Sequence, residues 1–495
     1  GAQVRSTNAR WPPWRLSVRV VGRGMAAVPR GFGREKKAYP PRKTGLTFER
    51  ISHTARMETL LRLFPSTLSP DVHVRRASEQ ELHQLESQPG MLAASFQLVA
   101  SPEVDTSIRQ AAAIYVKNRI SRTWDASLAR GFSDAPSAVS DQDKEVVRSG
   151  LLPTIASLPP TLRVHIASAM YSIVRCDFPQ AWPTLTEEIV KVLSSGEQLQ
   201  IFAGVRALLE LVRAFRFDCT DSKLESIVSH TFPTLLATVS ALMDSDHSDL
   251  PAVGEIVYYA MKTYKTSMMV TLTQHQQSNE SIVPWGSVML RIVQKSVVTD
   301  ADADADAREK APWWKAKKWA FYSLNKLFSR YGTPSQLAAS MKMYKPFAET
   351  FIHNFAPEIL KAYLHTADGI VSQHVWVSKP VLRHLLTFFS ECIRPKSMWQ
   401  LLRPHMQQII ETLVYPHLCF SDEDEELWEL DPIDFVRLGS DPFEELGTPS
   451  SAASMLLNVT VTRRTKSMFE PTLTFITHVL NAYPAQCTAR QFDGC

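Results

Sequence analysis

From Met57 onward, apolar side chains recur with the spacing of an α-helix, and this periodicity limits the possible folds more than any other feature of the sequence. The segments 108–120, 201–215 and 381–393 each place apolar side chains at i, i+3, i+4 and i+7, which defines one face of a helix. Alternating apolar and polar runs, which are typical of strands, are almost absent. The sequence therefore predicts an all-α fold.

These helices are too many for one compact core. At 495 residues the chain exceeds the ~250–300 residues at which single domains usually stop growing. An internal echo indicates how the fold grows: SPDVHVRRA (69–77) is similar to SPEVDTSIRQA (101–111), which places Arg75 and Arg109 thirty-four positions apart. Periods of ~34–47 residues are typical of stacked helical hairpins. We therefore predict a solenoid of helical hairpins with a concave binding surface.

The chain contains thirty-one prolines, which is compatible with many short helices. Proline fits the first turn of a helix and stops a preceding one, so we expect prolines to separate the helices and not to interrupt them. The prolines to which this expectation applies are Pro65, Pro179, Pro183, Pro233, Pro395 and Pro404.

Residues 1–56 differ from the rest of the chain. They are rich in Arg, Gly and Pro, carry thirteen basic side chains against two acidic ones, and show no sustained period. We expect a disordered extension that is either artefactual or a leader, such as a mitochondrial transit peptide or a nucleic-acid-binding arm. Because the whole chain has 54 basic and 50 acidic side chains, residues 57–495 carry 41 basic and 48 acidic ones. The predicted solenoid, including its concave surface, is therefore acidic and suits a basic partner.

Several other classes of protein are disfavoured. The six cysteines form no CxxC pair and no His/Cys metal spacing, which is typical of a reducing compartment, and we expect most of them to be small buried side chains. No apolar run approaches the ~18 residues of a membrane span. The motifs GxxxxGK[ST], HExxH and GxSxG are missing. We therefore expect no enzyme activity, no cofactor, no metal site and no membrane insertion.

The segment PWWKAKKWAFYSLNKLFSRYGTP (312–334) combines tryptophans with lysines and raises the question of nucleic-acid binding. On a helix that starts at Pro312, the apolar residues from Ala320 to Tyr331 form one stripe. We expect the tryptophans to fill gaps between hairpins and the lysines to face acidic neighbours, since base stacking needs exposed aromatics. The expected solvated flank comprises Lys315, Lys318, Asn325 and Ser329, with Lys317 along the apolar edge.

A second segment, FSDEDEELWELDPIDF (420–435), has eight carboxylates between Asp422 and Asp434 and is followed by further acidic residues. We predict an acidic loop at 421–446. Such a loop is either simply solvated, or it is anchored by its interleaved Trp and Phe and presents a polyanionic patch to a basic partner. The ADADADA run (301–307) has no such anchors and predicts a low-complexity loop at 300–310.

Several of these motifs resemble one family. RQAAAIYVKNRISRTW (109–124) is similar to the importin-β N-terminal domain motif, in which an aliphatic–Lys–Asn step precedes a Trp. The segments 312–334 and 420–437 resemble the importin seven/eight branch of the karyopherins, and DFPQAW (177–182) resembles the DYPxxW of that branch. The resemblance covers roughly residues 57–490. It departs at both ends: the basic leader has no counterpart, and the chain stops at QFDGC where family members continue, as in a truncated fragment or a mispredicted gene.

The resemblance implies a right-handed superhelical solenoid of HEAT repeats, with an importin N-terminal domain at 57–135 and further repeats at 136–495. Family members bind Ran-GTP through the first repeats, carry basic cargo such as ribosomal proteins and histones, and contact FG-repeat nucleoporins. We accordingly expect a monomeric nuclear transport receptor that shuttles between cytoplasm and nucleus through the pores of the nuclear envelope. A static HEAT scaffold without Ran-regulated release, and a nucleic-acid-binding solenoid led by residues 1–56, are the alternatives.

The resemblance also implies candidate sites. The candidate Ran-binding residues lie on the 109–124 helix, and Lys117 and Asn118 are favoured because Arg109 can form a contact within its repeat and Tyr115 lies on the buried stripe. These candidates are Arg109, Tyr115, Lys117, Asn118 and Arg119. The candidate acidic residues that would bind cargo, or the basic side of Ran, are Asp422, Glu423, Asp424, Glu425 and Glu426.

Overall fold

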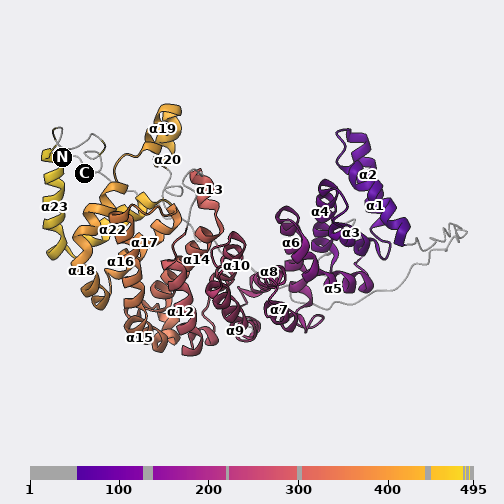
Figure 1. The fold of residues 1–495 in the computed structure, drawn as a ribbon, viewed down its shortest axis with the longest axis horizontal. Coiled ribbons are helices and arrows are strands. Elements are labelled where there is room, and N and C mark those ends of the chain that lie inside the picture. Colours follow the sequence, from indigo (N-terminus) through magenta and orange to yellow (C-terminus); the bar gives the residue numbers. More distant parts are fainter. Residues whose placement is uncertain are drawn as a thin grey trace, which may run out of the picture. The chain divides into compact units, whose positions relative to one another are not determined.

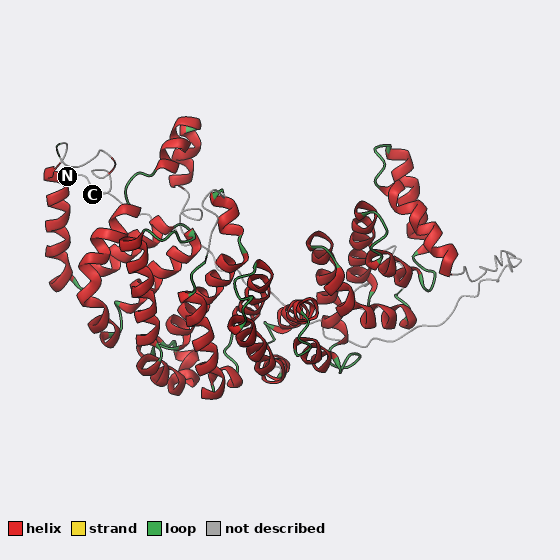
Figure 2. Ribbon diagram, viewed as in Figure 1, coloured by secondary structure: helices red, strands yellow, loops and turns green. Residues whose placement is uncertain are grey.

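The computed structural model describes residues 53–125, 138–218, 222–297, 304–440 and 447–482, together with Ala485 and Arg490. The predictions made for the leader up to residue 52 and for residues 300–303 and 441–446 lie outside the described residues. Within the described ranges every regular element is a helix, and Figure 2 draws no strand there. The prediction of an all-α fold is confirmed.

The helices follow one another along the chain as labelled in Figure 1. The first ten are α1 His53–Thr67, α2 Val72–Leu85, α3 Met91–Ala100, α4 Thr106–Thr123, α5 Asp141–Ser157, α6 Pro160–Asp177, α7 Leu185–Leu193, α8 Gln198–Phe215, α9 Lys223–Asp244 and α10 Pro251–Ser267. The next six are α11 Gln274–Gln277, α12 Asn279–Gln294, α13 Ala305–Lys310, α14 Pro312–Lys326, α15 Lys345–Asn354 and α16 Ala356–Gln373. Then come α17 Lys379–Cys392, α18 Lys396–Ile409, α19 Asp422–Leu430, α20 Pro432–Ser440, α22 Pro449–Arg463 and α23 Thr465–Ala482.

Shorter turns of π and 3₁₀ geometry join some of these helices. The π turns are η1 Leu327–Tyr331 and η4 Ile410–Val414, and each continues the preceding α-helix without a break. The 3₁₀ turns are η2 Pro334–Gln336, η3 Ala339–Tyr344 and η5 Tyr415–His417.

Neighbouring helices pack as hairpins, and the hairpins stack in order. The pairs are α1 with α2, α3 with α4, α5 with α6, α7 with α8, α9 with α10, α12 with α14, and α16 with α17. From α4 onward the second members contact one another in series, and α22 follows α17 in the same row. We call this row the second-helix layer; it consists of α4, α6, α8, α10, α14, α17 and α22. Because no hairpin can bury its apolar side alone, one continuous core runs from Leu60 to Met468. The predicted stack of hairpins is confirmed.

The echo in the sequence marks the starts of two helices. Asp71 accepts a hydrogen bond from the His73 backbone N–H at 2.8 Å and caps α2, and Asp105 caps α4 through the Ser107 N–H at 2.8 Å. The arginine one turn further in, Arg109 of α4, donates from Nε to the Val99 carbonyl at 3.0 Å. The two copies therefore share a capping Asp followed four residues later by an Arg, which marks the N-terminus of each helix.

The prediction for prolines is wrong at half of the positions. Pro65, Pro233 and Pro404 lie inside α1, α9 and α18, whereas Pro179, Pro183 and Pro395 lie between helices as predicted. An internal proline costs about 3 kcal/mol, mainly through a lost hydrogen bond and a clash with the previous turn. Phe64 and Phe232, the residues before two of these prolines, are fully buried, and burying a phenylalanine contributes about 1.5–3 kcal/mol. Tertiary packing of this size offsets the local cost.

Two further predictions concern α9 and α13. In the part of the chain that the structure describes, α9 has the length and hydropathy of a membrane span. It nevertheless buries Ile227, Phe232 and Leu235 in the core and packs against α7, α8, α10 and α12, as a central helix of a solenoid must.

The loop predicted at 300–310 is wrong over its second part, because residues 305–310 form α13. Of the three described cysteines, Cys392 is buried and the other two are half-buried.

Candidate partner-binding surfaces

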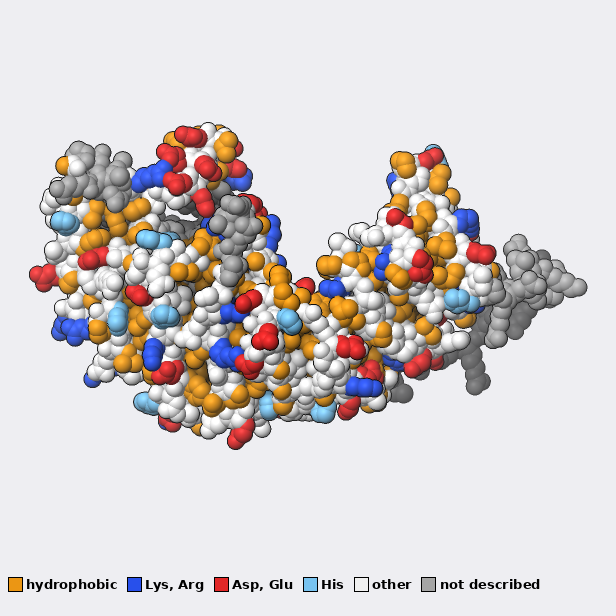
Figure 3. All heavy atoms as spheres, in the orientation of Figure 1, with side chains coloured by type: hydrophobic (Ala, Val, Ile, Leu, Met, Phe, Trp, Pro, Cys, Tyr) orange, Lys and Arg blue, Asp and Glu red, His pale blue; other side chains and the backbone are white. Residues whose placement is uncertain are grey.

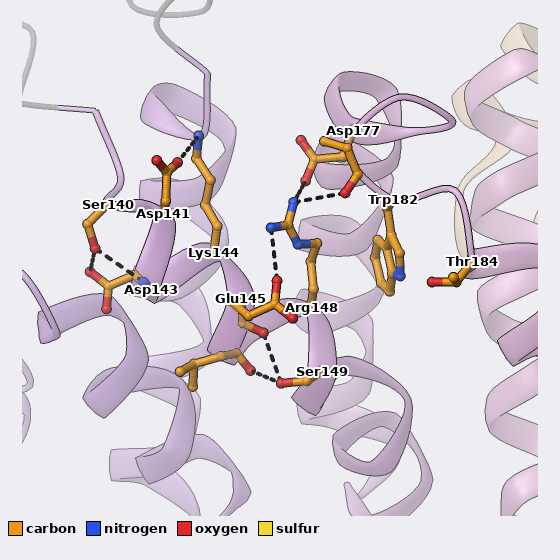
Figure 4. A network of polar contacts seen from close by, with 12 residues as sticks. Ser140, Asp141, Asp143, Lys144, Glu145, Arg148, Ser149, Asp177, Trp182 and Thr184 are labelled. Atoms are coloured by element: carbon orange, nitrogen blue, oxygen red, sulfur yellow. Dashed lines mark hydrogen bonds and ion pairs between the residues drawn. The ribbon is translucent and has the colours of Figure 1, made fainter.

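A polar network fixes the helices around the first candidate surface (Figure 4). The Asp143 carboxylate, at the start of α5, is buried and accepts hydrogen bonds from the backbone N–H groups of Gly90 and Ala93, both at 3.0 Å. These donors belong to the first turn of α3, which has no side-chain cap of its own. Ser140 completes the network by donating to Asp143 at 2.8 Å. A single carboxylate therefore holds the N-terminus of α3 against α5.

Asp177, at the end of α6, joins three helices. Its Oδ2 accepts from Nη1 of Arg148 at 2.9 Å (Figure 4). Its Oδ1 accepts from Nε1 of the fully buried Trp124 at 3.0 Å. Trp124 ends α4 and Arg148 belongs to α5. The Asp of DFPQAW and the Trp of the 109–124 motif, which lie fifty-three positions apart, are thus partners in one contact.

The structure separates the candidate Ran-binding residues into two groups. Arg109 and Arg119 are buried, and Arg119 donates to Thr123 Oγ1 at 2.7 Å and to the Glu86 carbonyl at 2.9 Å. These two arginines hold α4 against α2 and α3. Tyr115 is also largely enclosed, and burial raises the pKa of its hydroxyl above the usual range.

Lys117 and Asn118 lie on the accessible side of α4. Asn118 is exposed and Lys117 is half-buried. Burial, and to a smaller extent Lys117, lower the pKa of His165 on α6, the helix that packs against α4. Of the five candidates, these two residues have the access that a partner surface needs.

The acidic segment is a pair of helices, so the predicted loop at 421–446 is wrong over the described residues 422–440. Ser421 and Asp424 form a capping box at the start of α19, with Ser421 Oγ accepting from the Asp424 N–H at 3.1 Å. Four carboxylates lie in the first turn, where the positive end of the helix dipole stabilises them. A run of acidic residues at this position favours a helix.

The aromatic residues of this segment pack on one another. Phe435 of α20 makes edge contacts with Phe420 and Trp428, with ring centroids 5.8 and 5.5 Å apart. Leu430 and Ile433, at the turn between the two helices, are more than 80% exposed. The candidates Asp422, Glu423, Asp424, Glu425 and Glu426 lie on α19, and Figure 3 shows acidic side chains gathered over this hairpin. We call α19 and α20 together the acidic hairpin.

Ion pairs with Lys379 and Arg490 tie the acidic hairpin to other described parts of the chain. Glu423 accepts from Nζ of Lys379, at the start of α17, at 2.5 Å. Asp422 and Glu425 both pair with Arg490. Glu426 is exposed and takes part in neither contact. The hairpin therefore presents carboxylates and exposed apolar side chains together.

The tryptophan-rich segment forms α14 and η1 from Pro312 to Tyr331, as predicted. Trp313 and Trp314 are buried and Trp319 is half-buried, so the packing role is confirmed. The expectation of a solvated flank is wrong at Asn325, which donates to the His384 carbonyl at 2.7 Å and accepts from Tyr363 at 3.1 Å. The expectation of acidic neighbours is wrong for two lysines: Lys317 Nζ donates to the Val293 carbonyl at 2.8 Å and Lys326 Nζ to the Met269 carbonyl at 2.9 Å.

An apolar cavity of about 440 Å³ lies between α12, α14, α15 and α16. Leu290 of α12, Leu324 of α14 and Ile359 of α16 line it, together with the stacked rings of Phe351 and Phe355. Across the described residues, no three His, Cys, Asp or Glu side chains gather as a metal ion would require.

The sequence matches two family models. Residues 78–157 match the importin-beta N-terminal domain, and residues 337–491 match Cse1. The first match contains the whole of α4 with Lys117 and Asn118. The second contains the acidic hairpin.

Three curated proteins illustrate the likeness over most of the chain. The importin beta-like SAD2 homolog of Arabidopsis thaliana is 28% identical over 84% of this chain and 40% of its own length. Nonsense-mediated mRNA decay protein 5 of Saccharomyces cerevisiae is 29% identical over 86% of this chain and 41% of its own. Importin-8 of Homo sapiens is 26% identical over 86% of this chain and 40% of its own length. The chain spans about two fifths of the length of these relatives.

Solved structures agree on the fold. The exportin Cse1 in its cargo-free, cytoplasmic state gives a TM-score of 0.68 at 17% identity, covering 89% of this chain and 45% of that one. The Kap95:Nup1 complex gives a TM-score of 0.57 at 16% identity, and the match covers 88% of this chain and 45% of that one. A structure of Kap95p that concerns the switch loops of RanGDP gives 0.53 at 16% identity, covering 88% and 44%. These are solenoids of the importin-β and exportin type, which confirms the predicted architecture.

Proposed function

Because the chain belongs to the importin-β superfamily of karyopherins, we propose that it is a nuclear transport receptor that binds Ran-GTP and carries basic protein cargo into the nucleus. The single observation that supports this most is the importin-beta N-terminal domain at 78–157, which contains the accessible residues Lys117 and Asn118. Solved neighbours include both exportin and importin structures. The inward direction of transport is supported by the relatives that are named importins.

We place the contact with Ran-GTP on the accessible side of α4. Lys117 and Asn118 are positioned from behind by the buried Arg109 and Arg119, which join α4 to its neighbours. A rigid helix that presents one cation and one amide can recognise a protein surface at little cost in conformational entropy. The Kap95p structure that concerns RanGDP supports such a partner for the family.

The acidic hairpin is the proposed contact for basic cargo, such as ribosomal proteins and histones. Its carboxylates attract a cationic surface, while the exposed Leu430 and Ile433 add apolar area that can be buried in a complex. The two helices of the hairpin contact each other more than they contact the remaining helices, so the hairpin can adjust to different partners. For FG-repeat nucleoporins, the apolar cavity beside Leu290 and Phe355 has the chemistry to accept a phenylalanine side chain.

A pull-down with the full chain and Ran loaded with a non-hydrolysable GTP analogue or with GDP tests the proposal. We expect at least tenfold more retention of the GTP form. The double variant Lys117→Glu/Asn118→Ala should lose this retention, whereas Lys191→Glu on the exposed side of α7 should keep it. Equal retention of both forms, or of neither, would support the static HEAT scaffold instead.

Cargo binding has its own test. A linker histone serves as the basic probe, and the variant Glu423→Gln/Glu425→Gln/Glu426→Gln removes three of the eight carboxylates of the hairpin while leaving its capping box intact. We expect weaker histone binding by this variant, and a 5–150-fold weakening in the wild-type chain when the GTP form of Ran is added, since coupling energies of ~1–3 kcal/mol are typical. Histone binding that the variant keeps in full would contradict the assignment of the hairpin.

A further inference from the structure

Ten basic side chains form a continuous row across five neighbouring helices of the second-helix layer. We call this row the basic stripe. It consists of Arg163 of α6, Arg206 and Arg213 of α8, Arg216 just beyond α8, Lys262 and Lys265 of α10, Lys318 and Lys326 of α14, Arg330 in η1, and Arg383 of α17. The sign is opposite to the negative surface that the acidic composition predicted for the solenoid.

These basic groups lower one another's pKa, which indicates that they lie close together. Burial and then Arg213 and Arg206 lower the pKa of Lys262 to about 8. The pKa of Lys265 is lowered by burial and then by Arg216 and Lys262. Like charges disfavour one another's protonated forms only over short distances, so side chains of α8 and α10 share one surface.

The row continues onto the next two helices. The pKa of Lys318 is lowered by burial and then by Arg383, and that of Lys326 is lowered to about 8 by burial and then by Arg330 and Lys265. α10, α14 and α17 pack directly against one another in this order. The stripe therefore crosses the hairpin boundaries of the solenoid.

Few carboxylates balance these charges. Glu210 is buried and pairs with Arg206 at 3.2 Å and with Arg213 at 3.0 Å. Glu255 acts on Arg163, and Glu309 acts on Lys318. Across the described ranges, these three are the carboxylates that ion pairs and pKa shifts place beside the stripe. Cations outnumber them by about three to one, so the stripe keeps a surplus of positive charge.

Aromatic rings hold the cations in place. Arg206 lies over the Tyr259 ring at 4.5 Å and Lys262 over the Tyr258 ring at 5.2 Å. On the next helix, Trp319 lies beneath both Lys265 at 5.0 Å and Lys318 at 5.1 Å. Cation–π contacts of this kind restrict the side chains without neutralising them. A partner then finds the charges already arranged, which lowers the entropy lost on binding.

The same contacts favour one class of partner. A nucleic acid that binds such a surface stacks its bases on exposed aromatic faces. Here the chain's own cations cover faces of Tyr258, Tyr259 and Trp319. Carboxylates need no ring face and form charge-assisted hydrogen bonds with ammonium and guanidinium groups.

We propose that the basic stripe binds an extended acidic segment of a partner polypeptide. Packed helices lie ~8–10 Å apart, so the four spacings between five helices span roughly 32–40 Å. An extended chain covers about 3.3 Å per residue, so about ten to twelve residues match this length. The surface has the opposite charge to the acidic hairpin, and the proposal does not rest on the proposed transport function.

Fluorescence anisotropy with the full chain tests the proposal. The probe is a fluorescein-labelled peptide of twelve residues in which Glu and Gly alternate. We expect saturable binding that weakens as salt rises, and a loss of more than tenfold in affinity in Lys262→Glu/Lys265→Glu. The control Lys342→Glu/Lys345→Glu makes the same change of charge at exposed positions of η3 and α15 and should stay within twofold of the wild type.

The neutral variant Lys318→Gln/Arg383→Gln alters the neighbouring part of the stripe and should also weaken binding, so the test does not depend on one folded variant. Circular dichroism melting shows which variants keep their fold. Equal losses in the stripe and control variants, or no binding by the wild type, would refute the proposal. Oligouridylate of the same length is the comparison probe. If it binds more tightly than the peptide through the same residues, the partner is a nucleic acid and the proposal of an acidic polypeptide is wrong.

Discussion

At the scale of single residues, buried polar side chains connect helices that are far apart in the sequence. Asp143 holds the first turn of α3 across fifty-three positions, and Asn325 bridges α14 to the His384 carbonyl of α17. A helical period places a residue on a face of its helix, but it does not say which carbonyl or ring arrives opposite that face. For this reason the sequence predicted the helix of Asn325 correctly and its environment wrongly.

The first prediction concerns Asp143. Its replacement by Ala should destabilise the N-terminal helices by about 1–3 kcal/mol, because two part-buried N–H groups at the start of α3 lose their acceptor. Asp141→Ala is the matched control, since the Asp141 side chain is fully exposed and makes one loose ion pair with Lys144 at 3.7 Å. Urea unfolding of both variants measures the difference, and similar midpoints for the two would contradict the role assigned to Asp143.

The second prediction concerns the buried ammonium group of Lys317. Burial and then Lys295 lower its pKa in the folded chain from 10.5 to about 8. Between pH 8 and 10.5 the unfolded chain holds this proton more tightly, so the free energy of unfolding should rise with pH, by an amount on the order of 2 kcal/mol.

Lys317→Met removes the titrating group, so its stability should follow pH less steeply than that of the wild type over this window. Urea unfolding monitored by tryptophan fluorescence measures both curves, and the exposed Lys342→Met serves as control. Parallel curves for wild type and Lys317→Met from pH 7.5 to 10 would argue against a charged, desolvated Lys317.

At the scale of helices, periodicity and capping residues predicted most of the fold. The helices at 106–123, 198–215 and 379–392 agree with the expected segments, because their apolar faces are set by local spacing. The acidic hairpin was missed although its signal is local: Ser421 followed three residues later by Asp424 is a capping box. The basic stripe was missed because its members come from five helices, and the spacing of Tyr258, Tyr259, Lys262 and Lys265 in YYAMKTYK marks only the part on α10.

The third prediction concerns the close approach of α10 and α14. A Cβ at Gly254 would lie 2.8–3.1 Å from the indole ring of Trp313, so Gly254→Ala should destabilise the chain by about 1–3 kcal/mol. At Gly369 of α16 the nearest atom would be 3.9 Å away. Gly369→Ala should therefore stabilise the chain, by up to ~1 kcal/mol, through the better helix propensity of Ala. Thermal melting compares the two, and shifts of the same sign would contradict the packing argument.

At the scale of the whole chain, the extensive contacts join helices that are neighbours in the stack. In such an array, stability is approximately a sum of nearest-neighbour terms, and local unfolding need not spread. The Asp of DFPQAW and the Trp of the 109–124 motif show how the sequence encodes these terms, since each motif contains one partner of an interface between hairpins.

The fourth prediction follows from this arrangement. Asp177→Ala breaks the contacts to Trp124 and Arg148, so amide hydrogen exchange should accelerate in α4, α5 and α6. Exchange in α14 and α17, which are several hairpins away in the stack, should remain within experimental error of the wild type. Mass spectrometry of peptides from both regions gives the answer, and uniform acceleration along the chain would indicate a single cooperative unit.

The π turns at Leu327–Tyr331 and Ile410–Val414 have a consequence for tracing the ancestry of the repeats. A π turn accommodates one inserted residue, and here each lies at the end of its α-helix, so an insertion shifts the start of the next segment while the buried positions before it keep their spacing. Any alignment of these repeats at constant spacing loses phase after each such insertion and compares buried positions with exposed ones. Duplicated hairpins of this solenoid should therefore be matched by their inward-facing side chains and not by counting along the chain.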